Sequence, residues 1–143
     1  MRVGIVIVSH SALLAEGVVE LAGQMAQGKV VIVAAGGIMD GILGTSVEKI
    51  TDALYKVEAG LDSAHPSEGI IVFLDMGSAV MATEMAIEAF TVNQRQVQVI
   101  ISPAPLVEGA IVAAVEASIG NSLQEVAAAA AEAHALPKLH SHT

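Results

Sequence analysis

Four short apolar runs, rich in valine and isoleucine, constrain the fold of this chain more than any other feature of its sequence. They are VGIVIV (3–8), KVVIVA (29–34), GIIVFL (69–74) and VQVII (97–101). Runs of this length that are nearly continuous in apolar residues are typical of parallel strands covered on both faces. The sequence therefore predicts a parallel sheet of four strands.

Helical patterns follow each of these runs. Apolar residues recur at every third or fourth position, which predicts helices with one face turned toward the sheet. Methionines within these stripes are expected to fill the core. The predicted buried stripes are Leu14, Val18, Leu21 and Met25; Val47, Ile50, Leu54 and Val57; Met81, Met85 and Phe90; and Ile111, Val115 and Ile119.

Capping signals mark two of the helix starts. Thr45 and Glu48 have the spacing of a capping box, and so do Ser122 and Glu125, which precede a last, alanine-rich helix. The order is therefore strand then helix, four times, followed by one more helix. This order predicts an α/β fold with a doubly wound, mainly parallel four-stranded sheet and helices on both faces.

Length and composition set the class of molecule. The 143 residues suit a single domain, predicted over residues 1–136, with a flexible tail at residues 137–143. No apolar run approaches the roughly 18 residues of a membrane span, and the N-terminus lacks the pattern of a signal peptide. The chain has no cysteine, which excludes disulfides and thiolate chemistry. We therefore expect a cytoplasmic protein.

The charge balance limits the partners. Fifteen acidic residues face only six basic ones, for a net charge of −9, and the basic residues are scattered along the chain. Binding to nucleic acid or to an anionic membrane surface depends on clustered cations, so neither is expected. An acidic protein is better suited to docking a basic protein partner.

Reactive groups in an open parallel sheet gather beyond the carboxyl ends of the strands. The first apolar run leads into Ser9-His10-Ser11, and the third leads into Asp75-Met76-Gly77-Ser78. The second enters a glycine-rich loop at residues 34–46, and the fourth enters residues 102–110. Glycines, polar side chains and one imidazole are therefore expected to meet at this edge.

His10 is the main catalytic candidate. Imidazole is a nucleophile that forms a covalent bond which can later be broken. His10 also precedes a predicted helix N-terminus, where free N–H groups and the helix dipole favour an anion such as a phosphoryl group. The alternative is a histidine that ends the strand and only caps the next helix or bonds a carbonyl.

Asp75 is the second candidate. A carboxylate beside the imidazole could accept a hydrogen bond from one ring nitrogen and leave the other free to attack. The alternative is a helix cap or a solvated carboxylate at the strand end. Contact with His10 is expected if the first and third strands are neighbours in the sheet.

Small and hydroxyl-bearing residues at the same edge are candidates for supporting a phosphoryl group. The glycine-rich loop lacks the spacing of a Walker A or dinucleotide motif, so no nucleotide cofactor is expected on this chain. Of the histidines His134, His140 and His142, the last two form a pair in the predicted flexible tail with no carboxylate or cysteine nearby, and a flexible tail rarely makes a specific site, so no metal site is expected. The supporting candidates are Ser9, Ser11, Gly37, Thr45, Ser46, Gly77 and Ser78.

Several segments together resemble a known family. They are GIVIVSHSALLAEGVVELAGQM, GTS, FLDMGSAVMATEMA and APLVEGAIVAAVEASIG. In order and spacing they are similar to DhaM, the phosphotransferase subunit of the phosphoenolpyruvate-dependent dihydroxyacetone kinases, over about residues 3–133. The resemblance implies a fold similar to the mannose-type EIIA domain of the sugar phosphotransferase system.

The resemblance also implies a function. A separate phosphocarrier, HPr, would phosphorylate His10, and His10 would pass the phosphoryl group to ADP bound on the nucleotide subunit, DhaL, for the phosphorylation of dihydroxyacetone. The phosphorylated histidine of the family corresponds to His10, and its strand-end aspartate corresponds to Asp75. Members usually pair as dimers, so a homodimer is expected.

Two other functions remain open at this point. The chain could be the EIIA component of a mannose-type sugar permease, which would use the same His10 chemistry with another acceptor. It could also be a non-enzymatic binding or regulatory domain, in which His10 never carries a phosphoryl group.

Overall fold

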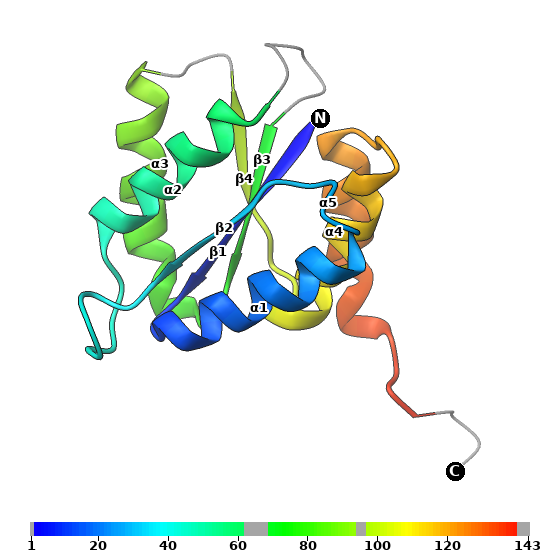
Figure 1. Cartoon of the computed structure of the whole chain (residues 1–143), viewed down its shortest axis with the longest axis horizontal. Coiled ribbons are helices and arrows are strands. Elements are labelled where there is room, and N and C mark those ends of the chain that lie inside the picture. The colour runs from blue at the N-terminus through cyan, green and yellow to red at the C-terminus, as the bar shows by residue number, and fades with distance from the viewer. Residues whose placement is uncertain (1, 62–68, 94–96, 140–143) are drawn as a thin grey trace.

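The computed structural model describes residues 2–61, 69–93 and 97–139, and its centre is one parallel sheet (Figure 1). The strands are β1 (Val3–Ser9), β2 (Ile32–Gly36), β3 (Gly69–Leu74) and β4 (Gln98–Ile101). Their order in the sheet is β2-β1-β3-β4, and every neighbouring pair is parallel. The predicted four-stranded parallel sheet is confirmed.

Helices cover both faces of this sheet (Figure 1). α1, α4 and α5 pack on one face, and α2 and α3 pack on the other. Short 3₁₀ turns precede α3 and follow α5. The bounds are α1 (Ala12–Met25), α2 (Val47–Ala59), η1 (Gly77–Ala79), α3 (Val80–Asn93), α4 (Leu106–Ser118), α5 (Leu123–Ala131) and η2 (Glu132–Ala135).

β1 is the most enclosed element of the molecule. All seven of its residues are buried, because it lies between β2 and β3 and carries helices on both faces. Successive side chains of a strand point to opposite faces: Ile5 and Ile7 belong to the core under α1, α4 and α5, whereas Val6 and Val8 belong to the core under α2 and α3. This burial explains why the run is apolar without alternation.

The topology fixes where a site can form. From β1 the chain passes to β2 on one side, and from β2 it crosses to β3 on the other side of β1. The strand order therefore reverses between β1 and β3, which is the place where open α/β sheets bind ligands. The register pairs Val8 with Leu74, so the residues that follow, at the ends of both strands, are neighbours.

One of the two predicted capping boxes is correct. The Ser122 hydroxyl accepts from the Glu125 N–H, and the Glu125 carboxylate accepts from the Ser122 N–H, as a capping box requires. The box predicted for Thr45 and Glu48 is wrong. α2 begins one residue later, and Ser46 is its N-cap, with its hydroxyl accepting from the Lys49 N–H.

The predicted buried faces are correct for α2 and largely wrong elsewhere. Ile50, Leu54 and Val57 of α2 are buried as predicted, and Val47 is partly buried. Val18 of α1 and Phe90 of α3 are buried as predicted too. Other large side chains predicted to be in the core are instead exposed on α1, α3, α4 and the residue that follows α4; they are Leu14, Leu21, Met25, Met81, Met85, Val115 and Ile119.

Alanines occupy the inner faces in their place. Ala15 and Ala22 of α1 and Ala86 of α3 are fully buried. On α4, Ala110, Ala113 and Ala114 are fully buried, and Ala117 is 9% exposed. Small side chains let the helices approach the sheet closely, since the interior is packed without voids. Met25, Met81 and Met85 are therefore not core residues.

The predicted tail is in contact with α4. The Lys138 ammonium lies 2.8 Å from a carboxylate oxygen of Glu108, although Lys138 is largely exposed. Residues 140–143, including His140 and His142, lie outside the described residues, and the predicted tail boundary at residue 137 stays a prediction.

Two neighbouring positions of α3 test the corrected inner face. Ala86→Leu forces extra volume against the sheet and should lower the free energy of unfolding by about 1–3 kcal/mol. Met85→Ala removes a half-exposed side chain and should change it by less than about 1 kcal/mol. Urea denaturation of both variants measures the difference; a larger loss for Met85→Ala would contradict the packing described here.

Candidate active site

His10 lies in the short connection between β1 and α1. Its backbone is held from the loop that follows β2: the Gly37 N–H donates to the Ser9 carbonyl at 3.1 Å, and the Gly44 N–H donates to the His10 carbonyl at 2.9 Å. Gly36 permits this closeness, because a Cβ there would lie 2.6 Å from the Ser11 carbonyl oxygen. The glycine-rich loop thus fixes the backbone of His10.

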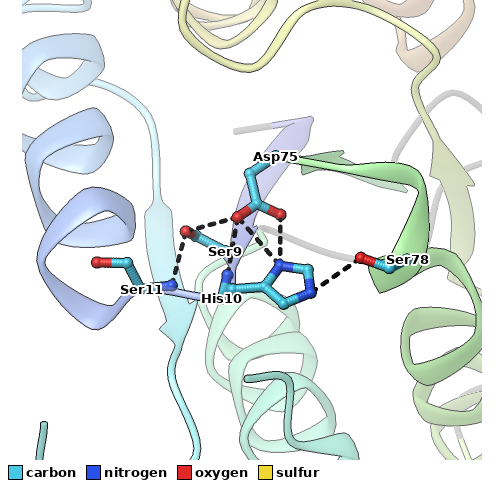
Figure 2. A network of polar contacts seen from close by, with 5 residues as sticks. All are labelled: Ser9, His10, Ser11, Asp75 and Ser78. Atoms are coloured by element: carbon cyan, nitrogen blue, oxygen red, sulfur yellow. Dashed lines mark hydrogen bonds and ion pairs between the residues drawn. The ribbon is translucent and has the colours of Figure 1, made fainter. Parts of the chain in front are cut away.

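Asp75 follows β3 and accepts four hydrogen bonds or close polar contacts from the end of β1 (Figure 2). One carboxylate oxygen accepts from the His10 N–H at 2.9 Å and from the Ser9 hydroxyl at 3.0 Å. The ring atom Nδ1 of His10 lies 3.0 Å from the other oxygen and 3.2 Å from the first. The predicted contact between the two residues is present.

These contacts determine the tautomer of the imidazole. An ionised carboxylate only accepts hydrogen bonds, so Nδ1 must carry the proton that it donates to Asp75. In the neutral ring Nε2 then has the free electron pair. The Ser78 hydroxyl lies 3.0 Å from Nε2 and donates to it. The nitrogen with the lone pair is therefore the one that faces away from Asp75.

Asp75 is the ionised partner in this pair. Burial raises the pKa of its carboxyl, but hydrogen bonds from the His10 backbone, the His10 ring and the Ser9 hydroxyl, with the charge of His10, outweigh burial and lower the pKa below its usual value. The side chain of Asp75 is 10% exposed and that of His10 is 23% exposed. The charged carboxylate of Asp75 is thus more buried than the His10 side chain, which solvent can still reach.

The reactive nitrogen points toward η1. Figure 2 places Nε2 beside Ser78, on the side of the ring away from α1. The sequence suggested that a group on His10 would face the N-terminal amides of α1. The ring turns the other way because Asp75 holds Nδ1, so an added group would lie near the start of η1 and α3.

Three of the residues predicted to support a phosphoryl group, Ser9, Ser11 and Gly37, have other hydrogen-bonding roles. Ser9 holds Asp75, and its hydroxyl also accepts from the Ser11 N–H at 3.0 Å. Ser11 is the N-cap of α1, with its hydroxyl accepting from the Leu14 N–H. Gly37 has its N–H committed to Ser9. None of these three directs a free donor toward Nε2.

Three further candidates lie at the starts of helices. Ser46 caps α2 and Thr45 precedes it, so neither joins the His10 network. Gly77 opens η1, beside Ser78. Of the seven supporting candidates, Ser78 is the one whose side chain contacts Nε2.

Gly36 and Gly44 were missed as positioning residues. Gly44 has φ +145°, a conformation that favours glycine, and its N–H bonds the His10 carbonyl. The sequence signal was the glycine density of residues 36–44, but spacing alone does not say which glycine approaches which backbone group.

Within residues 2–61, 69–93 and 97–139, no three metal-ligating side chains form a cluster. The Nδ1 of His134 lies 2.7 Å from the Ala131 carbonyl, and His65 lies outside the described residues. No helix in the described ranges has the length and apolar character to span a membrane.

Comparison with known proteins decides the family. The profile of the EIIA-man family, described as "PTS system fructose IIA component", matches residues 4–127. The phosphoryl donor subunit DhaM of PEP-dependent dihydroxyacetone kinase 2 from Listeria innocua is 36% identical over 124 residues, which are 87% of this chain and 93% of that protein. The chain belongs to the EIIA-man family, in its DhaM group. The resemblance drawn from the sequence motifs is confirmed.

Two further comparisons extend this assignment. The DhaM subunit of the PEP-dependent dihydroxyacetone kinase of Escherichia coli K12 is 39% identical over 127 residues, or 87% of this chain. The chain spans 25% of that longer protein. The crystal structure of EF1359, a protein of unknown function, superposes with a TM-score of 0.75 at 32% identity, over 92% of this chain and 95% of that one.

The lowered pKa of Asp75 predicts a pH dependence of stability. The ionised carboxylate is favoured in the folded state, so its stabilising effect is full above the usual pKa of about 3.9 and is lost as the pH falls through the lower folded-state pKa. Asp75→Asn should cost about 1–3 kcal/mol at pH 7, and this difference from the parent should shrink below about pH 4. Urea unfolding at several pH values measures it; a difference that grows on acidification would contradict the sign.

Proposed function

We propose that this chain is a phosphoryl carrier of the dihydroxyacetone kinase system. His10 accepts a phosphoryl group from phosphorylated HPr and passes it to ADP bound on the nucleotide subunit DhaL, which supports the phosphorylation of dihydroxyacetone at the expense of phosphoenolpyruvate. The observation that carries this proposal is the arrangement of Asp75, His10 and Ser78, which leaves a lone pair on Nε2 of a side chain that is 23% exposed.

The transfer step follows from this geometry. The lone pair of Nε2 attacks phosphorus and forms the new N–P bond, while the bond from phosphorus to the donor nitrogen breaks and its electron pair returns to the donor. The proton on Nδ1 stays in place. The His10 ring gains positive character as the bond forms, and the Asp75 carboxylate at 3.0 Å stabilises it.

Ser78 has a different role in the proposal. Its hydroxyl donates to Nε2 before transfer, and it must turn away from the lone pair as phosphorus approaches. It can then donate to an oxygen of the phosphoryl group, at the start of η1 and α3 where the dipole favours an anion. No cofactor is proposed on this chain, because ADP is held by the partner subunit.

The relatives support this acceptor over the alternatives. The proteins from Listeria innocua and Escherichia coli are named phosphoryl donor subunits of dihydroxyacetone kinases. The description of the family profile names a sugar component of the phosphotransferase system, so a permease is the second candidate acceptor. A purely binding domain would not require the Asp75 carboxylate to orient the ring. The cytoplasmic location stays a prediction.

A homodimer is part of the proposal. On α1, Leu14, Gly17, Leu21 and Met25 fall on one helical stripe that carries no charge, and the three large side chains are about half exposed. A Cβ on Gly17 would meet no atom within 4 Å, so a second helix could approach closely there. Sedimentation equilibrium should therefore give twice the chain mass; a monomer at micromolar concentration would contradict pairing.

A reconstituted relay tests the function. With phosphoenolpyruvate, enzyme I, HPr, DhaL and the dihydroxyacetone-binding subunit, the parent should support product formation and His10→Gln should abolish it while keeping its stability. Asp75→Ala should slow the relay by about 10²-fold, because the ring loses its orienting partner. Dihydroxyacetone phosphate is the measured product. An active His10→Gln variant would refute the carrier role, and transfer to a sugar permease alone would select the second candidate.

A further inference from the structure

Ser9 is the last residue of β1, and its side chain is completely buried. Figure 2 shows its hydroxyl between two partners: it accepts from the Ser11 N–H at 3.0 Å and donates to Oδ2 of Asp75 at 3.0 Å. A hydroxyl has a single proton and an ionised carboxylate only accepts hydrogen bonds, so the direction of both bonds is fixed. The Ser9 hydroxyl is therefore committed to Asp75.

The backbone of Ser9 is as constrained as its side chain. Ser9 pairs with Gly36 in the ladder between β1 and β2, and its carbonyl accepts from the Gly37 N–H at 3.1 Å. Groups that regular elements carry are held more precisely than groups on loops. Ser9 thus presents its hydroxyl to Asp75 from the most enclosed strand of the sheet.

Asp75 lies beyond the end of β3, so its side chain depends on bonds from β1. Oδ2 accepts from the Ser9 hydroxyl and from the His10 N–H. Two donors on one oxygen restrain rotation of the carboxylate and leave Oδ1 at 3.0 Å from Nδ1 of His10. Without Ser9, the His10 N–H would be the one bond besides the ring that holds the carboxylate.

The other contact of the ring cannot select the tautomer. Ser78 lies 3.0 Å from Nε2, and a hydroxyl can either donate to a lone pair or accept from an N–H. Both tautomers of His10 therefore satisfy Ser78. The tautomer depends on how firmly Asp75 is held against Nδ1.

α1 takes part in this arrangement through Ser9. Ser11 is the N-cap of α1, and the N–H groups at this end of a helix carry positive partial charge. The Ser11 N–H polarises the hydroxyl to which it donates and makes that hydroxyl a stronger donor toward Asp75. The N-terminus of α1 thus stabilises the carboxylate that holds the ring.

We propose that Ser9 is a positioning residue for phosphoryl transfer by His10. Its hydroxyl, oriented by the start of α1, holds the Asp75 carboxylate in the orientation that keeps the proton on Nδ1 and the lone pair on Nε2. Ser9 acts through Asp75 and does not contact the phosphoryl group. This inference rests on the proposed function and assigns the choice of tautomer to a buried residue behind the ring.

Two readouts of Ser9→Ala test the positioning role. ¹⁵N NMR of the unphosphorylated chain, labelled with ¹⁵N-histidine, distinguishes protonated from unprotonated ring nitrogens. The parent should keep its proton on Nδ1 of His10, and Ser9→Ala should shift part of the population to the Nε2–H tautomer. For transfer from phosphorylated HPr, kcat should fall about fivefold, as expected for one lost hydrogen bond. KM should be unchanged because Ser9 is buried and cannot touch the donor.

Ser102 provides the matched control. It follows β4 and is 5% exposed, and its hydroxyl accepts from the Ala104 N–H at 3.1 Å, just as that of Ser9 accepts two residues onward. Within the described residues, the hydrogen bonds to the Asp75 carboxylate come from Ser9 and His10. Ser102→Ala should therefore lose the same local bond and change neither the tautomer nor kcat.

A second pair of variants separates the hydroxyl from the effects of volume. Ser9→Thr keeps the hydroxyl, and Ser9→Val replaces it with a methyl group in a side chain of nearly the same shape. Ser9→Thr should keep the Nδ1–H tautomer, and Ser9→Val should show the same shift as Ser9→Ala. The comparison decides the question even if Ser9→Ala is too unstable to study.

The outcomes are distinguishable. A parent that phosphorylated HPr does not phosphorylate would refute the proposed function, and the ring spectra would still show whether Ser9 fixes the tautomer. Equal spectra and equal kcat for Ser9→Ala and Ser102→Ala would overturn the role of Ser9, and so would equal spectra for Ser9→Thr and Ser9→Val. A raised KM with unchanged kcat would place Ser9 in donor binding and would also overturn it.

Discussion

The hydrogen bonds between His10 and Asp75 join the ends of two neighbouring strands, and the architecture of the sheet serves to bring those ends together. β1 and β3 are adjacent because the chain crosses over β1 after β2, and their parallel register brings both carboxyl ends to the same level. One carboxylate then satisfies a backbone N–H, a hydroxyl and a ring nitrogen at once. These bonds are the reason that a partly buried carboxylate stays ionised.

The same interaction sets the chemistry of the ring. With Nδ1 committed to Asp75, the lone pair of the imidazole is confined to Nε2, and the ring cannot rotate without losing its partner. The glycine-rich loop adds a second restraint, because Gly44 holds the carbonyl of His10 while Gly36 leaves room for the start of α1. A nucleophile held at both backbone and ring needs little rearrangement before it reacts.

The sequence alone was sufficient to predict the repeated strand–helix order of the fold. Continuous Val and Ile runs identified the strands, and the strand-end rule placed His10 and Asp75 at the same edge of the sheet; their contact also needed β1 and β3 to be neighbours. The sequence prediction failed for much of the inner faces of α1, α3 and α4, where alanines pack on the sheet and large side chains such as Leu21, Met85 and Val115 are exposed. Periodicity registers large apolar residues and cannot tell a core stripe from an exposed apolar stripe. The direction of the His10 ring depends on contacts with Asp75 and Ser78, 65 and 68 residues away, which no local pattern contains.

The nitrogen that carries the phosphoryl group is the most direct test of this account. The chain should be labelled with ¹⁵N-histidine, phosphorylated by phosphoenolpyruvate, enzyme I and HPr, and examined by ¹⁵N and ³¹P NMR for phosphorus coupling to a ring nitrogen. We predict one acid-labile phosphoryl group per chain, coupled to Nε2 of His10, and none in His10→Ala. Coupling to Nδ1 would mean that Asp75 does not hold the ring during transfer. No phosphoryl group on the parent, with HPr shown to be competent toward another acceptor, would contradict the carrier role.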